Sequence, residues 1–140
     1  MLRQIISTHK TWATVPLRLA LGLIFIAHGA QKVFGAFGGR GFSAFINGTA
    51  PLGLWPSKLW LGAAALSELI GGVLVLLGLF TRVGAGAIAA VMLVAIVGVH
   101  SQSFFLNQGG MEFALANLCM ACTLLYLGGG KLSVDANLKM

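Results

Sequence analysis

Four long apolar stretches, separated by short segments rich in glycine, proline and charged residues, divide this sequence. They run over residues 17–34, 59–80, 83–99 and 113–127. Each contains about 15 to 22 residues, close to the roughly 20 that a helix needs to cross the hydrocarbon core of a bilayer. The first constraint on the fold is therefore that these segments are helices in a membrane.

The amino-acid composition supports this interpretation and excludes a soluble fold. Of the 140 residues, 58% are hydrophobic and only 9% are charged, and the mean hydropathy is +0.94. In a soluble domain, roughly a quarter of the residues are charged. Lipid must therefore surround most of this chain, and the lipid bilayer is its first expected partner.

The net charge of +6 does not indicate nucleic-acid binding. The nine Lys and Arg residues are scattered between the apolar stretches and form no basic run. Nucleic-acid-binding proteins gather such residues in a patch, whereas membrane proteins place them beside their spans. We expect no nucleic-acid partner.

The apolar stretches predict an all-α fold, because the alternating segments typical of membrane β-barrels do not occur. We expect an integral membrane four-helix bundle, formed as a single membrane domain over residues 1–140. Its transmembrane helices are expected at about 15–34, 58–80, 82–100 and 112–128. The segment at about 35–57 is Gly-rich but aromatic, and we expect it in the membrane interface as a loop or as a short helix around Phe42 to Ile46.

The positions of Lys and Arg predict the orientation, because cationic loops stay on the cytoplasmic side. An N-in, C-in arrangement leaves only Lys32, Arg40 and Lys58 outside. The first apolar stretch shows no small-residue cleavage site, so we interpret it as a retained helix and not as a signal peptide. The six inner cations are Arg3, Lys10, Arg18, Arg82, Lys131 and Lys139.

Three ionisable residues in the apolar stretches are candidate catalytic residues: Glu68, His28 and Lys32. Ionisable groups in a membrane are costly, and by default they face the bundle interior and carry function. At about 1.5 Å per residue, His28 lies roughly 9 Å and Glu68 roughly 15 Å from the outer ends of their helices. We predict a cluster in the outer half of the bundle, with Lys32 or His28 as the partner of Glu68.

Three further residues are candidate substrate-binding residues: His100, Glu112 and Arg18. His100 and Glu112 lie at the outer ends of their helices, and Arg18 shares a helix face with His28 and Lys32. Alternatively, Lys32 and Glu112 are ordinary helix-end charges that reach water. The histidines and carboxylates lie on separate helices without a local ligand pair, so no metal is expected.

Cys119 and Cys122 are the only cysteines and form a Cys-x-x-Cys motif. This spacing supports a redox-active disulfide. Alternatively, cysteine in an apolar helix serves as a small hydrophobic residue. Both interpretations stay open, and the two residues are a candidate redox pair.

Several motifs occur in order along the chain: Arg18-x3-Gly22-x5-His28-Gly29-x2-Lys32, Ser67-Glu68-Leu69-x-Gly71-Gly72, Leu77-Gly78-Leu79-x-Thr81-Arg82 and the later His100. Over about residues 15–130 they resemble the DoxX family of small four-helix bacterial membrane proteins, which includes DoxD-like relatives. The resemblance implies a multi-pass protein of the bacterial plasma (inner) membrane. It also implies a redox role, because DoxD-like proteins form membrane subunits of thiosulfate:quinone oxidoreductase and DoxX members belong to a membrane-associated oxidoreductase complex.

These observations lead to the hypothesis of a redox-system membrane subunit that binds a quinone or a similar lipid-soluble substrate. Glu68 and His28 would hydrogen-bond the quinone oxygens and relay protons, with Lys32 beside them. The sequence has no haem, iron–sulfur or dinucleotide motif, so unless the cysteines act, a membrane or peripheral redox partner protein must supply electrons. The small-residue helix faces also permit a homo-oligomer.

Two alternatives remain open at this stage. One is a noncatalytic membrane scaffold, assembly factor or small-solute carrier, in which buried polar groups fix helix packing. The other is a self-contained thiol oxidase that uses Cys119 and Cys122, since the four-helix architecture is also similar to the vitamin K epoxide reductase class.

Overall fold

The computed structural model describes residues 1–138; its regular elements over that range are all helical, which confirms the predicted all-α class. Lys139 lies outside the described residues. Four long helices occupy the four apolar stretches: α2 (Thr14–Val33), α4 (Ser57–Leu77), α5 (Thr81–Gly98) and α6 (Glu112–Leu127). Short helical segments flank or connect them: α1 (Leu2–Ile5), η1 (Ala36–Gly38), α3 (Phe42–Ile46), η2 (Pro51–Gly53), η3 (Leu106–Gln108) and α7 (Val134–Asn137).

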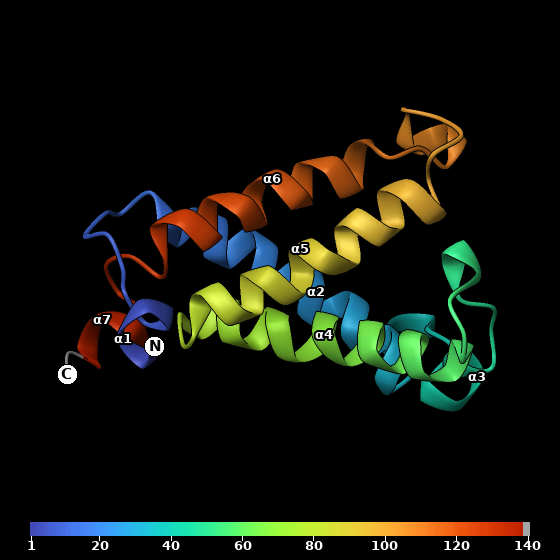
Figure 1. Cartoon of the computed structure of the whole chain (residues 1–140), viewed down its shortest axis with the longest axis horizontal. Helices are drawn as coiled ribbons and strands as arrows, with labels where there is room; N and C mark the ends of the chain where they lie inside the picture. The colour runs from blue at the N-terminus through green and yellow to red at the C-terminus, as the bar shows by residue number, and fades with distance from the viewer. Residues whose placement is uncertain (139–140) are drawn as a thin grey trace.

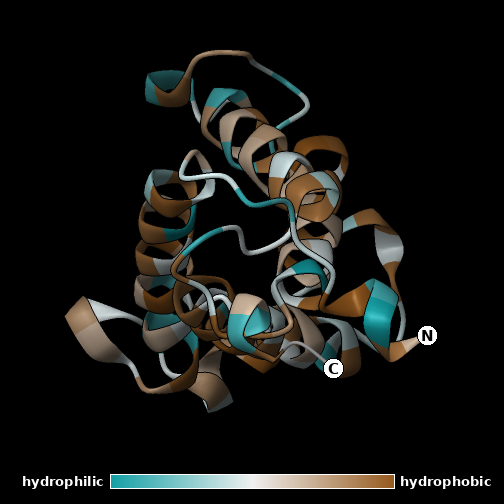
Figure 2. Ribbon diagram, turned by 90° about the vertical axis from the view of Figure 1, so that its left-hand side faces the viewer, coloured by the Kyte–Doolittle hydropathy of each residue, from teal (hydrophilic) through white to brown (hydrophobic). Residues whose placement is uncertain are grey.

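Three of the long helices are long and apolar enough to cross a membrane. These are α2, α4 and α5, with 20, 21 and 18 residues, whereas the apolar α6 has 16. Most residues of the long helices are hydrophobic (Figure 2), and many face outward: Leu19, Leu23, Ile70 and Leu93 are each at least half exposed. A soluble protein does not expose so much apolar surface. The helices and the surface together indicate a membrane protein.

Glycines bring α2 and α4 into close contact. A Cβ on Gly22 would lie 2.8 Å from the Cβ of Leu76, and a Cβ on Gly72 would lie 2.7 Å from the backbone nitrogen of Ile26. Small residues at such crossings let two helix backbones approach each other in lipid. The α2–α4 pair is consequently the most extensive helix contact in the described part of the chain.

A tight turn joins α4 to α5 in an antiparallel hairpin. Gly78 has φ of 68°, a conformation that glycine adopts without strain, and Phe80 follows with φ of 46°. Just beyond the turn the two helices touch, because a Cβ on Gly71 would lie 3.1 Å from the carbonyl oxygen of Gly84. The hairpin is therefore closed at the end near the chain termini.

An apolar core fills the bundle between the four long helices. Among its members that are at most 1% exposed, the largest are Leu21, Phe25, Val75, Ile88 and Leu124. They come from α2, α4, α5 and α6, so every long helix contributes to this core.

Toward the end opposite the termini, α5 and α6 diverge from α2 and α4 (Figure 1). The segment between α2 and α4 lies at this end, and it contains α3 over Phe42–Ile46, which confirms the expected short helix. The following turn η2 packs on the end of α5, where a Cβ on Gly98 would lie 2.8 Å from the Cβ of Pro51. This segment therefore bridges the two diverging helix pairs.

Candidate functional site

A cavity of about 570 Å³ lies where the two helix pairs diverge. Most of its walls are apolar, but four of the predicted site residues line it: His28, Lys32, Glu68 and His100. Residues far apart in sequence thus meet at one place, on α2, on α4 and just after α5. Its apolar wall includes Phe25, Phe45, Leu61, Ala64, Val91, Met92, Ala95 and Phe113.

An ion pair between Lys32 and Glu68 forms part of the cavity wall. The Lys32 Nζ lies 2.5 Å from both Oε1 and Oε2 of Glu68. The Glu68 side chain is only 4% exposed, whereas the Lys32 side chain is 27% exposed. The carboxylate is thus held inside the bundle by a cation that also faces the cavity.

The bridging segment between α2 and α4 packs beside this ion pair. Lys32 Nζ lies 5.3 Å from the centre of the Phe45 ring on α3, within range of a cation–π interaction. Thr49, Pro51 and Leu54 continue the same lining. Residues of α3 and η2 therefore form the wall of the cavity beside the ion pair.

His28 stands among aromatic rings at the α2–α6 side of the cavity. Its ring centre is 6.4 Å from that of Phe25 and 5.9 Å from that of Phe113. No hydrogen bond of its imidazole to the described residues is formed, although the residue is exposed to the cavity. The imidazole nitrogens are therefore open to a ligand.

His100 and Glu112 both lie at the end of the bundle opposite the termini (Figure 1), but in different settings. His100 lines the cavity, and its Nδ1 lies 2.7 Å from the carbonyl oxygen of Gly109. Glu112 does not line it; its Oε1 accepts a hydrogen bond of 2.6 Å from the backbone N–H of Leu106. The Glu112 carboxylate thus closes the loop between α5 and α6.

Arg18 lies at the opposite end of the bundle, away from the cavity. Its guanidinium donates hydrogen bonds to the carbonyl oxygens of Val75 and Leu76, which end α4. It also donates to the carbonyl oxygens of Gly129 and Leu132, beyond α6. The structure therefore places Arg18 as a clamp between α4 and the C-terminal segment, whereas His28, Lys32, Glu68 and His100 line the cavity.

The sequence analysis missed Asp135, the buried acid of this clamp region. Its carboxylate accepts hydrogen bonds from the backbone N–H groups of Phe80 and Thr81 and from the Thr81 hydroxyl, at 2.7 to 2.9 Å. These donors belong to the first turn of α5, so Asp135 caps that helix from a distant part of the chain. Sequence periodicity does not signal such a cap, because the acid is 54 residues from Thr81.

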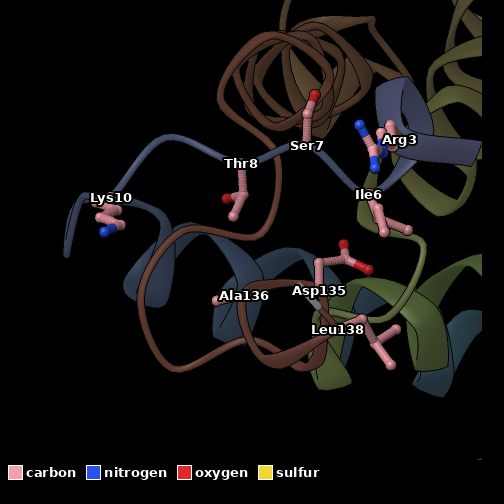
Figure 3. Close-up of a pocket in the computed structure, with 8 residues that line it drawn as sticks. All are labelled: Arg3, Ile6, Ser7, Thr8, Lys10, Asp135, Ala136 and Leu138. Carbon is pink, nitrogen blue, oxygen red and sulfur yellow. The ribbon is translucent and has the colours of Figure 1, made fainter. Parts of the chain in front are cut away.

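A smaller hollow of about 240 Å³ lies between the N-terminal arm and the C-terminal segment (Figure 3). Arg3, Lys10 and Thr8 line it together with Asp135. The Asp135 carboxylate already serves the α5 cap, and the two cations are exposed. This hollow therefore presents a ligand with fewer buried polar groups than the larger cavity does.

Cys119 and Cys122 are free thiols on the exposed side of α6. Neither lines the larger cavity. Among residues 1–138, no three His, Cys, Asp or Glu side chains gather closely enough to hold a metal ion.

Comparisons with known proteins agree on one family. The DoxX family matches residues 13–101, which include α2, α4 and α5. A protein of Bacillus subtilis (strain 168) named "Putative oxidoreductase CatD" is 34% identical over 122 residues, covering 87% of this chain and 84% of that protein. No solved structure matches the chain.

Proposed function

The chain belongs to the DoxX family, and on that premise we propose that it binds a quinone, or a similar lipid-soluble substrate, as the membrane subunit of a redox system. The observation that carries the proposal is the cavity of about 570 Å³, whose apolar walls hold His28, Lys32 and Glu68 at one side. An apolar pocket with a few convergent polar groups is the usual form of a small-molecule site.

We further propose four transmembrane helices, α2, α4, α5 and α6, in a multi-pass protein of the bacterial plasma membrane. At 16 residues, α6 spans about 24 Å, so it needs a locally thin bilayer or its flanking residues to cross. Both termini lie at one end of the bundle (Figure 1), which carries Arg3, Lys10, Arg82 and Lys131. This distribution favours N-in, C-in, with the cavity in the outer half.

The cluster suits the two oxygens of a quinone. Lys32 carries a positive charge toward the cavity and would polarise one quinone oxygen. His28 has free ring nitrogens and would donate to the other oxygen or exchange protons with it. His100 at the outer end of the same cavity would connect this proton exchange to the aqueous side.

Reduction of a quinone to a quinol takes two electrons and two protons, so the proposal needs a donor. The donor is a reduced centre of a redox partner protein, which is oxidised by two electrons as the quinone is reduced. The chain's own residues would supply the binding site and the protons. In this role the chain is an oxidoreductase subunit and not an enzyme by itself.

The first experiment is purification from the native membrane in mild detergent, followed by extraction and identification of bound quinone. The informative variants are Glu68→Gln and the apolar pair Lys32→Met/Glu68→Leu, with unfolding temperature measured on each. Stoichiometric quinone in the wild type that is lost in a folded variant supports the proposal. Absence of quinone from the wild type and from every folded variant contradicts it and favours a noncatalytic scaffold or small-solute carrier.

The thiol-oxidase alternative has a separate test, because Cys119 and Cys122 do not line the cavity. A Cys119→Ser/Cys122→Ser variant would abolish thiol oxidation in that alternative. In the quinone proposal the same variant keeps its bound quinone.

A further inference from the structure

One side of the larger cavity is lined by small side chains on two membrane helices. On α4 these are Ala63, Ala64 and Ser67, and on α5 they are Ala87, Ala90 and Val94. They follow the gap between the two arms of the α4–α5 hairpin, which is closed by Gly71 and Gly84 near the turn and opens away from it (Figure 1).

The other sides of the cavity are occupied by larger groups. At the α2–α6 side the rings of His28 and Phe113 lie 5.9 Å apart. At the outer end, Phe45 and Pro51 belong to the bridging segment and line the cavity. The side between α4 and α5 is lined mainly by small side chains such as those of Ala64 and Ala90, and its one large ring, that of Trp60, lies on the same stretch of α4 near the start of the helix.

The small-residue groove and the Lys32–Glu68 pair are parts of one continuous cavity. Ser67 on the groove and Glu68 in the interior are consecutive residues of α4, so the charged cluster and the groove are within one residue of each other on that helix. A ligand that fills both parts has a polar head and an aliphatic tail.

We infer that the substrate is a tailed amphiphile that enters sideways from the bilayer between α4 and α5. Its polar ring reaches Lys32, Glu68 and His28, and its aliphatic tail stays in the groove lined by Ala64, Ala87 and Ala90. This inference rests on the proposed function and adds the class of substrate and its route. It predicts that the chain distinguishes a tailed quinone from the same ring without a tail.

The test uses Trp60 as a reporter, because this residue lines the cavity and quinones quench tryptophan fluorescence. Trp12 and Trp55, which lie elsewhere, are replaced by Phe in all samples. The probes are a benzoquinone with a decyl tail and its tail-free parent, titrated into the full chain in lipid nanodiscs. Ala90→Phe fills the groove, and Ala116→Phe on the exposed side of α6 is the matched control.

We expect Ala90→Phe to weaken binding of the decyl quinone by about tenfold, while the tail-free ring binds as in the wild type. Ala116→Phe should change neither affinity. If Ala90→Phe leaves the decyl quinone unaffected, or weakens both probes equally, the tail groove is wrong and the quinone site itself stands. If neither probe binds the wild type, the proposed function falls and the groove with it.

The same variant, Ala90→Phe, also tests whether the groove holds a second copy of this chain instead of a quinone tail. If the groove holds a helix of a second copy of this chain, Ala90→Phe changes the mass of the assembly in native mass spectrometry and leaves the affinity for the decyl quinone unchanged. That result overturns the inference. An unchanged mass with a tail-specific loss of affinity supports it.

Discussion

The Lys32 ammonium on α2 bridges both carboxylate oxygens of Glu68 on α4, at 2.5 Å from each. This contact joins the two most extensively packed helices at the wall of the cavity. It gives the pair a structural contribution besides the proposed role in binding, and the two contributions respond differently to substitution.

Glu68→Gln leaves Lys32 without its charged partner beside a largely apolar cavity. Removing one member of a buried pair costs about 3 kcal/mol, because the other charge stays desolvated. The free energy of unfolding, measured by thermal or denaturant unfolding in detergent, should fall by about that amount.

The double variant Lys32→Met/Glu68→Leu should unfold within about 1 kcal/mol of the wild type, since two packed apolar groups replace the pair. It should nevertheless fail to bind quinone. An equal loss of stability in the single and double variants would show that the charges themselves stabilise the fold.

Gly72→Ala should destabilise the chain through the α2–α4 contact. The added Cβ would lie 2.7 Å from the backbone nitrogen of Ile26, and backbone cannot move aside as a flexible side chain does. We expect a loss of about 1 to 3 kcal/mol in unfolding free energy.

Gly86→Ala on α5 is the matched control for that substitution. The nearest atom to its added Cβ is Leu125 Cδ2 at 3.6 Å, an ordinary contact distance. Because alanine favours the helix over glycine, stability should be unchanged or rise by up to about 1 kcal/mol. If Gly72→Ala and Gly86→Ala lowered the unfolding free energy equally, the close α2–α4 contact would not be the cause of the loss at Gly72.

Arg18→Lys should lower stability without changing quinone binding. The guanidinium donates four hydrogen bonds to backbone carbonyl oxygens, and a single ammonium cannot reach all four. Two or more orphaned buried acceptors cost about 2 kcal/mol or more. Binding of the decyl quinone to the folded variant checks the second part, and a selective loss of affinity would restore Arg18 as a substrate-binding residue.

Asp135→Ala should destabilise the start of α5 by about 1 to 2 kcal/mol, the usual cost of a lost helix cap. Asp135→Asn should lose less, because its single side-chain oxygen can still accept one of the two backbone N–H groups, of Phe80 or of Thr81, while its NH2 group cannot accept the other. Hydrogen exchange at Thr81 measures the local effect. Equal protection in all three proteins would contradict the cap.

The sequence predicted the helices well because a membrane makes long apolar stretches unambiguous. It also singled out Lys32 as one of two partners for Glu68, since a buried carboxylate needs a cation within reach along a neighbouring helix. The sequence did not separate the polar residues at the two ends of the bundle, Arg18 at one and Lys32 at the other. Helix periodicity put Arg18 on the face of Lys32, but the carbonyl groups that it binds become available only where α4 and α6 end.

Other parts of the site depend on contacts that no local pattern encodes. The cavity arises from the divergence of two helix pairs, and this divergence depends on glycine contacts such as Gly71 with Gly84 at one end. The chemistry of the walls could therefore be anticipated from residue types. The open side between α4 and α5 could not.

The cap of α5 by Asp135 also constrains how the protein is made. During synthesis Thr81 leaves the ribosome before Asp135, the acceptor of its N–H group, which follows 54 residues later. Until then the first N–H groups of α5 lack the partner that they have in the finished protein. The α5–α6 hairpin must therefore be synthesised, and the chain after it must return to the end of the bundle that holds the α4–α5 turn, before α5 has its cap. Nascent chains arrested short of residue 135 would leave the first N–H groups of α5 uncapped.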